Sequence, residues 1–228
     1  MIPSLLDDSS PEQVLPSEVI NSITSLRNFI VENERTARRF LIRLGMKEFL
    51  DEIKFDVLNK HTQIEDISDM MLALKNGLSV GLISEAGCPG VADPGAEIVA
   101  AAHKLNIKVV PFTGPSSILL ALMASGLNGQ CFSFRGYLPV KPPARVRRIR
   151  ELEAQSRKEH MTQIFIEAPY RNNQLFQDLI ATLKPNTRLC LAINLTGPDE
   201  RIVTKSVGEW QKTRIEFQKM PAVFLFLG

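Results

Sequence analysis

The stretch Ser79–Gly95, SVGLISEAGCPGVADPG, contains the signals that decide the fold. Its opening residues, SVGLIS, are apolar without alternation, which is typical of a central strand in a parallel sheet. From Ser84 onward it holds three glycines and two prolines, and a helical pattern begins at Ala96. An ordinary connection between strand and helix takes about two to six residues, and this one is longer. We therefore predict a ligand-binding loop at the carboxyl edge of a parallel sheet.

A second loop of the same kind, Pro111–Ser117 (PFTGPSS), again runs from a strand end into a helix. Neither loop contains the GxGxxG dinucleotide fingerprint or the GK[ST] ending of a phosphate-binding loop. Ser116 suits two roles equally, because a serine can cap the following helix and helix N-terminal amides can bind polar ligands. Two such loops at neighbouring strand ends favour a binding site more than one loop does.

Strand and helix patterns alternate around the first loop, through residues 1–112. This alternation predicts an α/β domain with a mainly parallel sheet. The predicted strands are Asn28–Val31, Lys54–Leu58, Ser79–Ser84 and one beginning at Lys108–Pro111, and the predicted helices are Glu18–Arg27, Arg35–Leu44, Ile64–Lys75 and Ala96–Leu105.

Residues 113–228 follow a different pattern, because several strands succeed one another with few helices between them. We predict a second α/β domain with a mixed or antiparallel sheet, and a domain boundary near Phe112–Gly114. The predicted strands are Cys131–Phe134, Gln163–Ile166, Leu189–Ile193, Arg201–Thr204 and Ala222–Leu227, and the predicted helices are Ser116–Ser125, Ala144–Glu153 and Asn172–Leu183.

The composition, 44% hydrophobic and 23% charged over 228 residues, is that of a globular protein and excludes collagen-like, disordered and disulfide-scaffold classes. A net charge of +2 argues against a wholly basic nucleic-acid coat protein but leaves local basic patches open. No window approaches the ~18 apolar residues of a transmembrane helix. Met1–Ser10 lacks the basic start of a signal peptide. Three separate cysteines without a CxxC pair fit a reduced, cytoplasmic enzyme without structural zinc.

Five short motifs carry a resemblance to a known family. In collinear order over nearly the whole chain, they are similar to motifs of the tetrapyrrole methylase family of S-adenosylmethionine-dependent methyltransferases. The likeness is greatest to the branch that methylates a ribose 2′-hydroxyl of 16S ribosomal RNA. The motifs are Glu32–Arg35, Ser84–Gly95, Thr113–Ser116 with the helix end Ser125–Leu127, Gly136–Pro139 and Glu167–Arg171.

The chain departs from that family at three places. Family members open with a strand followed by proline–isoleucine–glycine–asparagine–leucine, whereas Met1–Leu6 contains no glycine, so we expect a shortened or replaced first strand. Glu85 stands in place of the loop aspartate and keeps its charge. Asn194 stands where the family has a carboxylate.

The resemblance implies a fold of two α/β domains with S-adenosylmethionine in the cleft between them. It also implies a cytoplasmic homodimer that acts on RNA of the small ribosomal subunit, with no membrane association and no metal. Methyl transfer from a sulfonium requires mainly binding and orientation, which agrees with the lack of a nucleophile–base constellation in the sequence. The implied cofactor-binding residues are Glu85, Gly87, Cys88, Pro89, Gly114, Ser116, Ser117, Ala168 and Ala222.

A ribose hydroxyl has a very high pKa, so a positioned base or charge would help its methylation. The resemblance favours Glu32 and Arg35 as the catalytic residues, although a solvated or helix-capping acid would also explain Glu32. Two basic helices are candidates for contact with RNA phosphates, one after Glu32 and one within Lys141–Arg150 (KPPARVRRIR). The alternative is a solvated helix face. The predicted substrate-binding residues are Arg38, Arg39, Arg145 and Arg148.

Two other functions stay open at this point. The same basic residues would suit a small acidic acceptor such as a tetrapyrrole. The missing glycine after Pro3 and the change at Asn194 also allow a protein that binds the cofactor without catalysing transfer.

Overall fold

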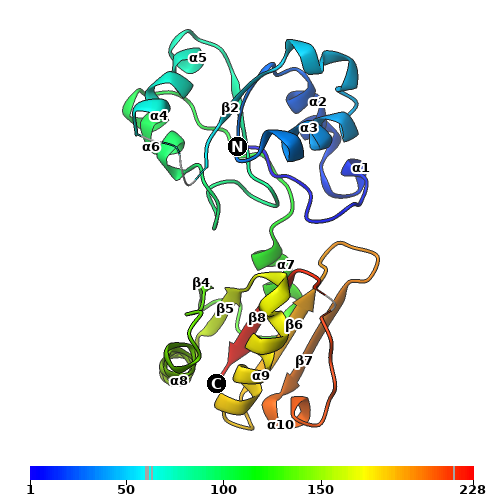
Figure 1. Cartoon of the computed structure of the whole chain (residues 1–228), viewed down its shortest axis with the longest axis vertical. Coiled ribbons are helices and arrows are strands. Elements are labelled where there is room, and N and C mark those ends of the chain that lie inside the picture. The colour runs from blue at the N-terminus through cyan, green and yellow to red at the C-terminus, as the bar shows by residue number, and fades with distance from the viewer. Residues whose placement is uncertain (60–61, 63, 218) are drawn as a thin grey trace. The chain divides into compact units, whose positions relative to one another are not determined.

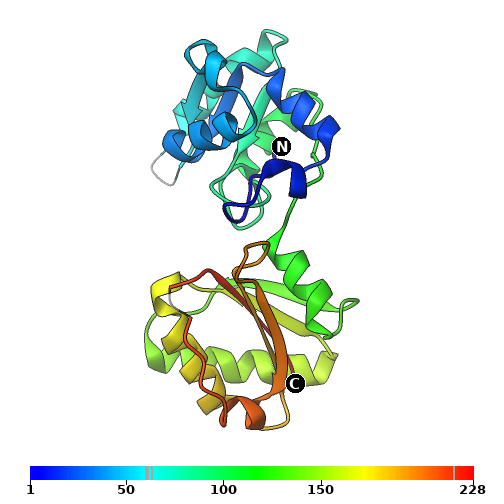
Figure 2. The ribbon, with the colours of Figure 1, turned by 90° about the vertical axis from the view of Figure 1, so that its right-hand side faces the viewer.

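The computed structural model describes residues 1–59, 62, 64–217 and 219–228. The chain forms two compact units, Met1–Ser116 and Ser117–Gly228, each with its own sheet and core (Figure 1, Figure 2). The predicted α/β class is confirmed for both units, because the first has a parallel sheet and the second a mixed one.

The sheet of the first unit has the strand order β2-β1-β3, with all neighbours parallel. The predicted central strand is β3, and its residues Val80–Ile83 pair in register with Asn28–Val31 of β1. Strand β2 is Lys54–Val57 and lies on the other side of β1. The glycine-rich loop therefore leaves the carboxyl end of a parallel strand, as predicted from its sequence.

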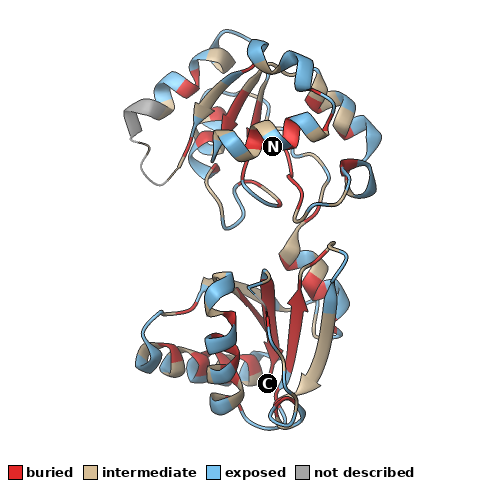
Figure 3. Cartoon of the chain, turned by 45° about the vertical axis from the view of Figure 1, so that its right-hand side comes forward, coloured by how far each residue is buried: buried red, intermediate tan, exposed pale blue. Residues whose placement is uncertain are grey.

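Helices cover both faces of this sheet (Figure 3). Phe29 and Val31 of β1 pack with α2, α3 and η1, whereas Ile30 points to the other face and packs with α4, α5 and α6. This double burial explains why the strands are apolar without alternation. The helices are α1 (Pro11–Val14), α2 (Ser17–Thr24), α3 (Glu34–Arg43), η1 (Lys47–Glu52), α4 (Ile64–Met70), α5 (Leu72–Lys75) and α6 (Ala96–Lys104).

The expected shortened first strand is present as two isolated bridges, Ile2 with Ile83 and Ser4 with Gly87. The Ile2 amide donates to the Leu82 carbonyl at 2.9 Å, so residues 1–4 extend the sheet beyond β3. The strand predicted from Lys108 is not formed. That segment is held instead by single hydrogen bonds, such as the one from the Phe112 amide to the Met1 carbonyl at 3.0 Å.

The sheet of the second unit has the strand order β4-β5-β8-β6-β7. Only β4 and β5 are parallel to each other, and the other neighbours are antiparallel. The strands are β4 (Phe132–Tyr137), β5 (Thr162–Ile166), β6 (Arg188–Ile193), β7 (Arg201–Ser206) and β8 (Ala222–Leu227).

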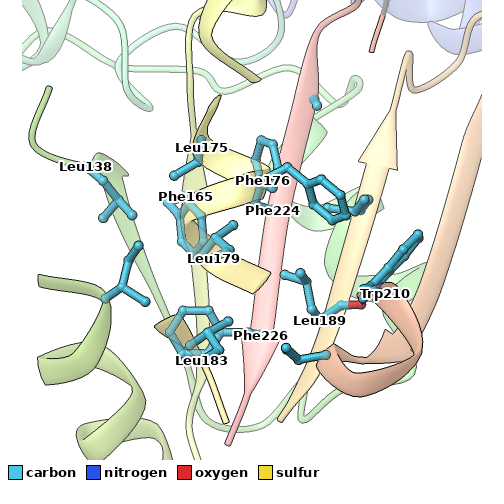
Figure 4. Close-up of a cluster of buried hydrophobic side chains, with 14 of the residues drawn as sticks. Leu138, Phe165, Leu175, Phe176, Leu179, Leu183, Leu189, Trp210, Phe224 and Phe226 are labelled. Carbon is cyan, nitrogen blue, oxygen red and sulfur yellow. The ribbon is translucent and has the colours of Figure 1, made fainter. Parts of the chain in front are cut away.

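One face of this sheet carries the main core of the unit (Figure 4). The rings of Phe165 and Phe224 stack at 5.8 Å between centroids, and Trp210 donates its indole N–H to the Leu189 carbonyl at 2.8 Å. Helices α8 (Pro142–Glu159), α9 (Asn172–Thr182) and α10 (Val207–Trp210) supply the cover on this face. Helix α7 (Ser117–Ser125) packs beside β6, β7 and β8 from the opposite face.

Arg145 of α8 is part of this packing. Its side chain is 3% exposed, and its guanidinium forms an ion pair with Asp178 of α9 at 2.5 Å. It also donates to the Val140 carbonyl at 2.8 Å, which ties the loop after β4 to α8. Of the two arginines predicted to bind substrate on this helix, Arg145 is thus buried, and Arg148 reaches the surface, where it pairs with Glu151 at 3.1 Å.

Replacing Arg145 by Ala should lower the free energy of unfolding of the second unit by about 3 kcal/mol, because it leaves the Asp178 carboxylate partly buried without its partner. Arg148→Ala on the same helix is the matched control and should change it by less than about 0.5 kcal/mol, since its ion pair is exposed. Urea titration followed by fluorescence of Trp210, the only tryptophan of the chain, measures both. Equal effects of the two substitutions would contradict this account.

Candidate functional site

The glycine-rich loop of the first unit is anchored to the opening residues of the chain. The amide of Ser4 donates to the Gly87 carbonyl at 2.9 Å, and the amide of Gly87 donates back to the Ser4 carbonyl at 3.2 Å. The Ser4 hydroxyl also donates to the Ser84 carbonyl at 3.2 Å. Gly87 has a φ of +73°, which a residue with a side chain adopts only with strain. The main chain of this loop is therefore held in one shape.

The two predicted loops meet. The thiol of Cys88 donates to the Pro115 carbonyl at 3.4 Å, and burial raises the pKa of that thiol. At Gly114 a Cβ atom would lie 2.7 Å from the Pro3 Cγ, so glycine is required for this close approach. Pro89 is buried beneath the first loop. The structure thus brings the predicted residues Gly87, Cys88, Pro89 and Gly114 together within the first unit.

Three carboxyl groups gather at the carboxyl ends of β1 and β3. Glu32 follows β1 directly, and its Oε2 accepts the Glu85 amide at 3.2 Å. Burial raises the pKa of Glu32, and the charges of Asp93 and Glu85 add to the rise, against the Glu85 hydrogen bond. Burial also raises the pKa of Asp93, with a further contribution from Glu85 and an opposing hydrogen bond from Ser84.

Such a group keeps its proton to a higher pH than a free carboxylic acid does, which brings its pKa closer to the range useful for proton transfer. The sequence predicted Glu32 and Glu85 in this cluster and missed Asp93. Asp93 lies in the same loop as Glu85, within the sequence Asp93-Pro94-Gly95, and this position could have identified it.

The arginines of helix α3 differ in their exposure and in their bonding partners. Asn33 caps it, with Oδ1 accepting the amides of Arg35 and Thr36 at 3.0 and 3.3 Å. The Arg35 side chain lies exposed in the first turn. Arg38 is held by an ion pair with Glu34 at 2.8 Å and lies 4.7 Å over the Phe55 ring.

Arg39 is exposed and makes no ion pair with a described residue, so it is the best placed of the four predicted arginines to meet an anion.

A pocket of about 550 Å³ lies between α3 and the opening segment of the chain. Its lining combines an apolar floor with charges of both signs, which suits a ligand that has an anionic part and a planar or sugar part. Arg43 secures its wall by donating to the Asp7 carbonyl at 3.4 Å and to the Ser9 carbonyl. The lining residues are Ser4, Leu5, Asp7, Asp8, Thr36, Arg39, Phe40, Ile42, Arg43 and Glu85.

The remaining predicted residues lie elsewhere. Ser116 ends the first unit and Ser117 begins α7 in the second. Ala168 follows β5 and Ala222 begins β8; because Ile166 pairs with Val223, these two alanines lie at the same end of the second sheet. Arg145 and Arg148 are on α8, with only Arg148 at the surface.

The described residues hold no group of His, Cys, Asp and Glu that could bind a metal ion. Every helix within the described part of the chain is too short or too polar to cross a membrane.

Comparison with solved structures identifies the fold. The crystal structure of the methyltransferase CobJ matches with a TM-score of 0.60, covering 95% of this chain and 89% of that one, at 14% sequence identity. At that identity the likeness shows that the two proteins share their α/β fold.

The family follows from the sequence comparison. Residues 23–211 match the model for tetrapyrrole (corrin/porphyrin) methylases, and the chain belongs to this family. This confirms the resemblance predicted from the loop motifs.

Relatives in this family carry the name ribosomal RNA small subunit methyltransferase I. The protein from Vibrio cholerae is 32% identical over 82% of this chain and 62% of its own length, and the one from Escherichia coli O157:H7 is 33% identical over 81% and 64%. The Pseudomonas aeruginosa protein is 31% identical over 98% of this chain and 75% of its own length. The chain thus spans less than two thirds of the first two relatives.

Replacing Glu32 by Gln should raise the thermal stability of the first unit at pH 8 and change it less at pH 4. Because the folded-state pKa of Glu32 is raised, its contribution to stability is present at low pH and is lost as the pH rises and the carboxyl must ionise. Glutamine avoids that loss and can still accept the Glu85 amide. Scanning calorimetry at the two pH values measures the difference.

Glu34→Gln, two residues along the chain, is the control for this experiment. It removes an attraction to Arg38 and should not stabilise the unit at pH 8. A stability gain for Glu32→Gln that is the same at both pH values would show that charge is not its cause.

Proposed function

We propose that this chain is an S-adenosylmethionine-dependent methyltransferase that methylates a ribose 2′-hydroxyl of small-subunit ribosomal RNA. The observation that carries the proposal is the acidic, glycine-lined edge of the first sheet beside the pocket that contains Arg39. Its support comes from membership of the methylase family and from relatives named for this activity.

The residues at this edge fit the cofactor by their chemistry. S-adenosylmethionine carries a sulfonium cation and an ammonium group, and the first loop supplies the carboxyl groups of Glu85 and Asp93. Gly87 and Gly114 have no side chain, and this allows the two loops and the opening segment to pack closely against one another. The proposed cofactor contacts are Glu85, Gly87, Cys88, Pro89, Gly114, Ser116 and Ser117, with Ala168 and Ala222 of the second unit.

When bound, the cofactor supplies an electrophilic methyl group. The chain's own residues bind and orient the acceptor. Glu32, with its raised pKa, accepts the proton of the ribose hydroxyl, and the exposed Arg35 stabilises the negative charge that develops. Arg39, on the pocket wall, contacts a phosphate of the same RNA, and Arg38 contributes a second positive charge from the same helix.

We further propose that the protein acts as a homodimer in the cytoplasm. Light scattering after size-exclusion chromatography measures the mass in solution. A mass of 25.5 kDa at micromolar concentration would contradict the dimer.

The function is tested by adding this protein, together with methyl-labelled S-adenosylmethionine, to fractions of an extract from cells that lack it. Label should enter RNA of the small ribosomal subunit and remain in an alkali-resistant dinucleotide, since a 2′-O-methyl group blocks cleavage at that position. Label in an extracted metabolite would favour the tetrapyrrole-type acceptor instead. Cofactor binding without label in any fraction would favour a non-catalytic protein.

Replacing Gly87 by Val should abolish cofactor binding measured by calorimetry while the chain stays folded. Its Cβ would lie 3.3 Å from Leu6 and 3.6 Å from the Pro115 carbonyl, where the two loops meet. Gly77→Val is the matched control, because Gly77 has a similar φ of +78° but open space around it. Unchanged cofactor affinity in Gly87→Val would refute the placement of the cofactor, and an equal loss in both variants would attribute the effect to backbone strain.

A further inference from the structure

The two tyrosines of the chain both lie in the second unit, at the ends of two neighbouring strands. Tyr137 is the last residue of β4 and pairs with Ile166, the last residue of β5. Tyr170 lies in η2 (Pro169–Arg171), just after β5. Because β4 and β5 are parallel, both tyrosines follow strand ends at the same edge of the sheet. Their exposed fractions are 60% and 71%, so both rings present large planar surfaces to solvent.

Arg171 is fixed beside these rings by a buried carboxylate. Oε1 of Glu167, whose side chain is 0% exposed, accepts Nε and Nη2 of Arg171 at 2.9 and 2.6 Å. The guanidinium lies 5.2 Å from the centre of the Tyr170 ring. The hydrogen bonds to Glu167 raise the pKa of Arg171.

The surroundings of the rings are polar and cationic. The segment after Tyr137 leads within four residues to the exposed Lys141, and Arg145 fixes that segment by donating to the Val140 carbonyl. Arg147 and Arg148 follow on the surface of α8, where both pair with the single carboxylate of Glu151. The core of a protein interface is depleted in such charges, whereas a nucleic-acid strand requires cations along its phosphates.

We propose that Tyr137, Tyr170 and Arg171 form a stacking platform for unpaired bases of the RNA substrate. Aromatic rings and arginine planes stack on any base, because every base has a π-face, and largely exposed rings are free to do so. The buried Glu167 holds the guanidinium plane in place, and the cations from Lys141 onward contact the adjacent phosphates. This platform rests on the proposed function and assigns it single-stranded RNA as the form of substrate that is bound.

The test uses the full chain and a fluorescein-labelled ten-nucleotide single-stranded RNA, with binding followed by anisotropy. Tyr137→Ala and Tyr170→Ala should each weaken binding at least about five-fold, the lower end of what one stacked base contributes. Tyr170→Phe keeps the ring and should bind within about two-fold of the wild type. Phe132→Ala is the matched control, because Phe132 is an exposed aromatic residue at the opposite end of β4.

Cofactor affinity, measured by calorimetry in the same variants, should stay unchanged. Wild-type affinity for RNA in both alanine variants would overturn the platform, as would a wild type that does not bind the strand. A loss of cofactor affinity would assign the rings to the cofactor. An equal loss of RNA affinity in Phe132→Ala would show that the effect is not specific to the two tyrosines. A wild type that transfers no methyl group to small subunits would contradict the proposed function, while the binding series still decides the platform.

Discussion

The reciprocal pair of hydrogen bonds between Ser4 and Gly87 is the constraint on which the first unit's site depends. It joins the opening segment of the chain to the glycine-rich loop, and the same segment brings Pro3 against Gly114 of the second loop. One wall of the pocket beside α3 is made from residues of this opening segment. The two main-chain hydrogen bonds, with the one from the Ile2 amide to the Leu82 carbonyl, hold the segment against the sheet and the first loop.

The acidic and the basic side chains of the first unit occupy different places. Carboxyl groups converge at the sheet edge, where burial and mutual repulsion raise the pKa values of Glu32 and Asp93. The arginines lie on α3, and the presence or absence of a bonding partner decides whether each can bind an anion. Arg38 and Arg43 are engaged by neighbouring groups, whereas Arg39 is left to solvent. The arrangement thus separates an acidic edge of the sheet from an exposed cation on α3.

The sequence allowed much of this fold to be predicted, because β3 and its loop follow strong local rules. An apolar strand without alternation and a glycine-rich exit depend on few distant contacts, so they can be read from the chain. Arg145 could not be separated from Arg148 in the same way, since its burial depends on Asp178, 33 residues away. The missing strand at Lys108 and the placement of Tyr137 and Tyr170 at the ends of neighbouring strands likewise depend on which segments become neighbours in space.

The contact between Cys88 and Pro115 has a consequence for the chemistry of the loops over time. Its thiol is half-buried, its hydrogen goes to a carbonyl of the other loop, and burial keeps the reactive thiolate scarce. Alkylation at this sulfur should therefore be slower than at a fully exposed thiol. The rate at which an alkylating reagent modifies Cys88 then reports how firmly the two loops stay in contact.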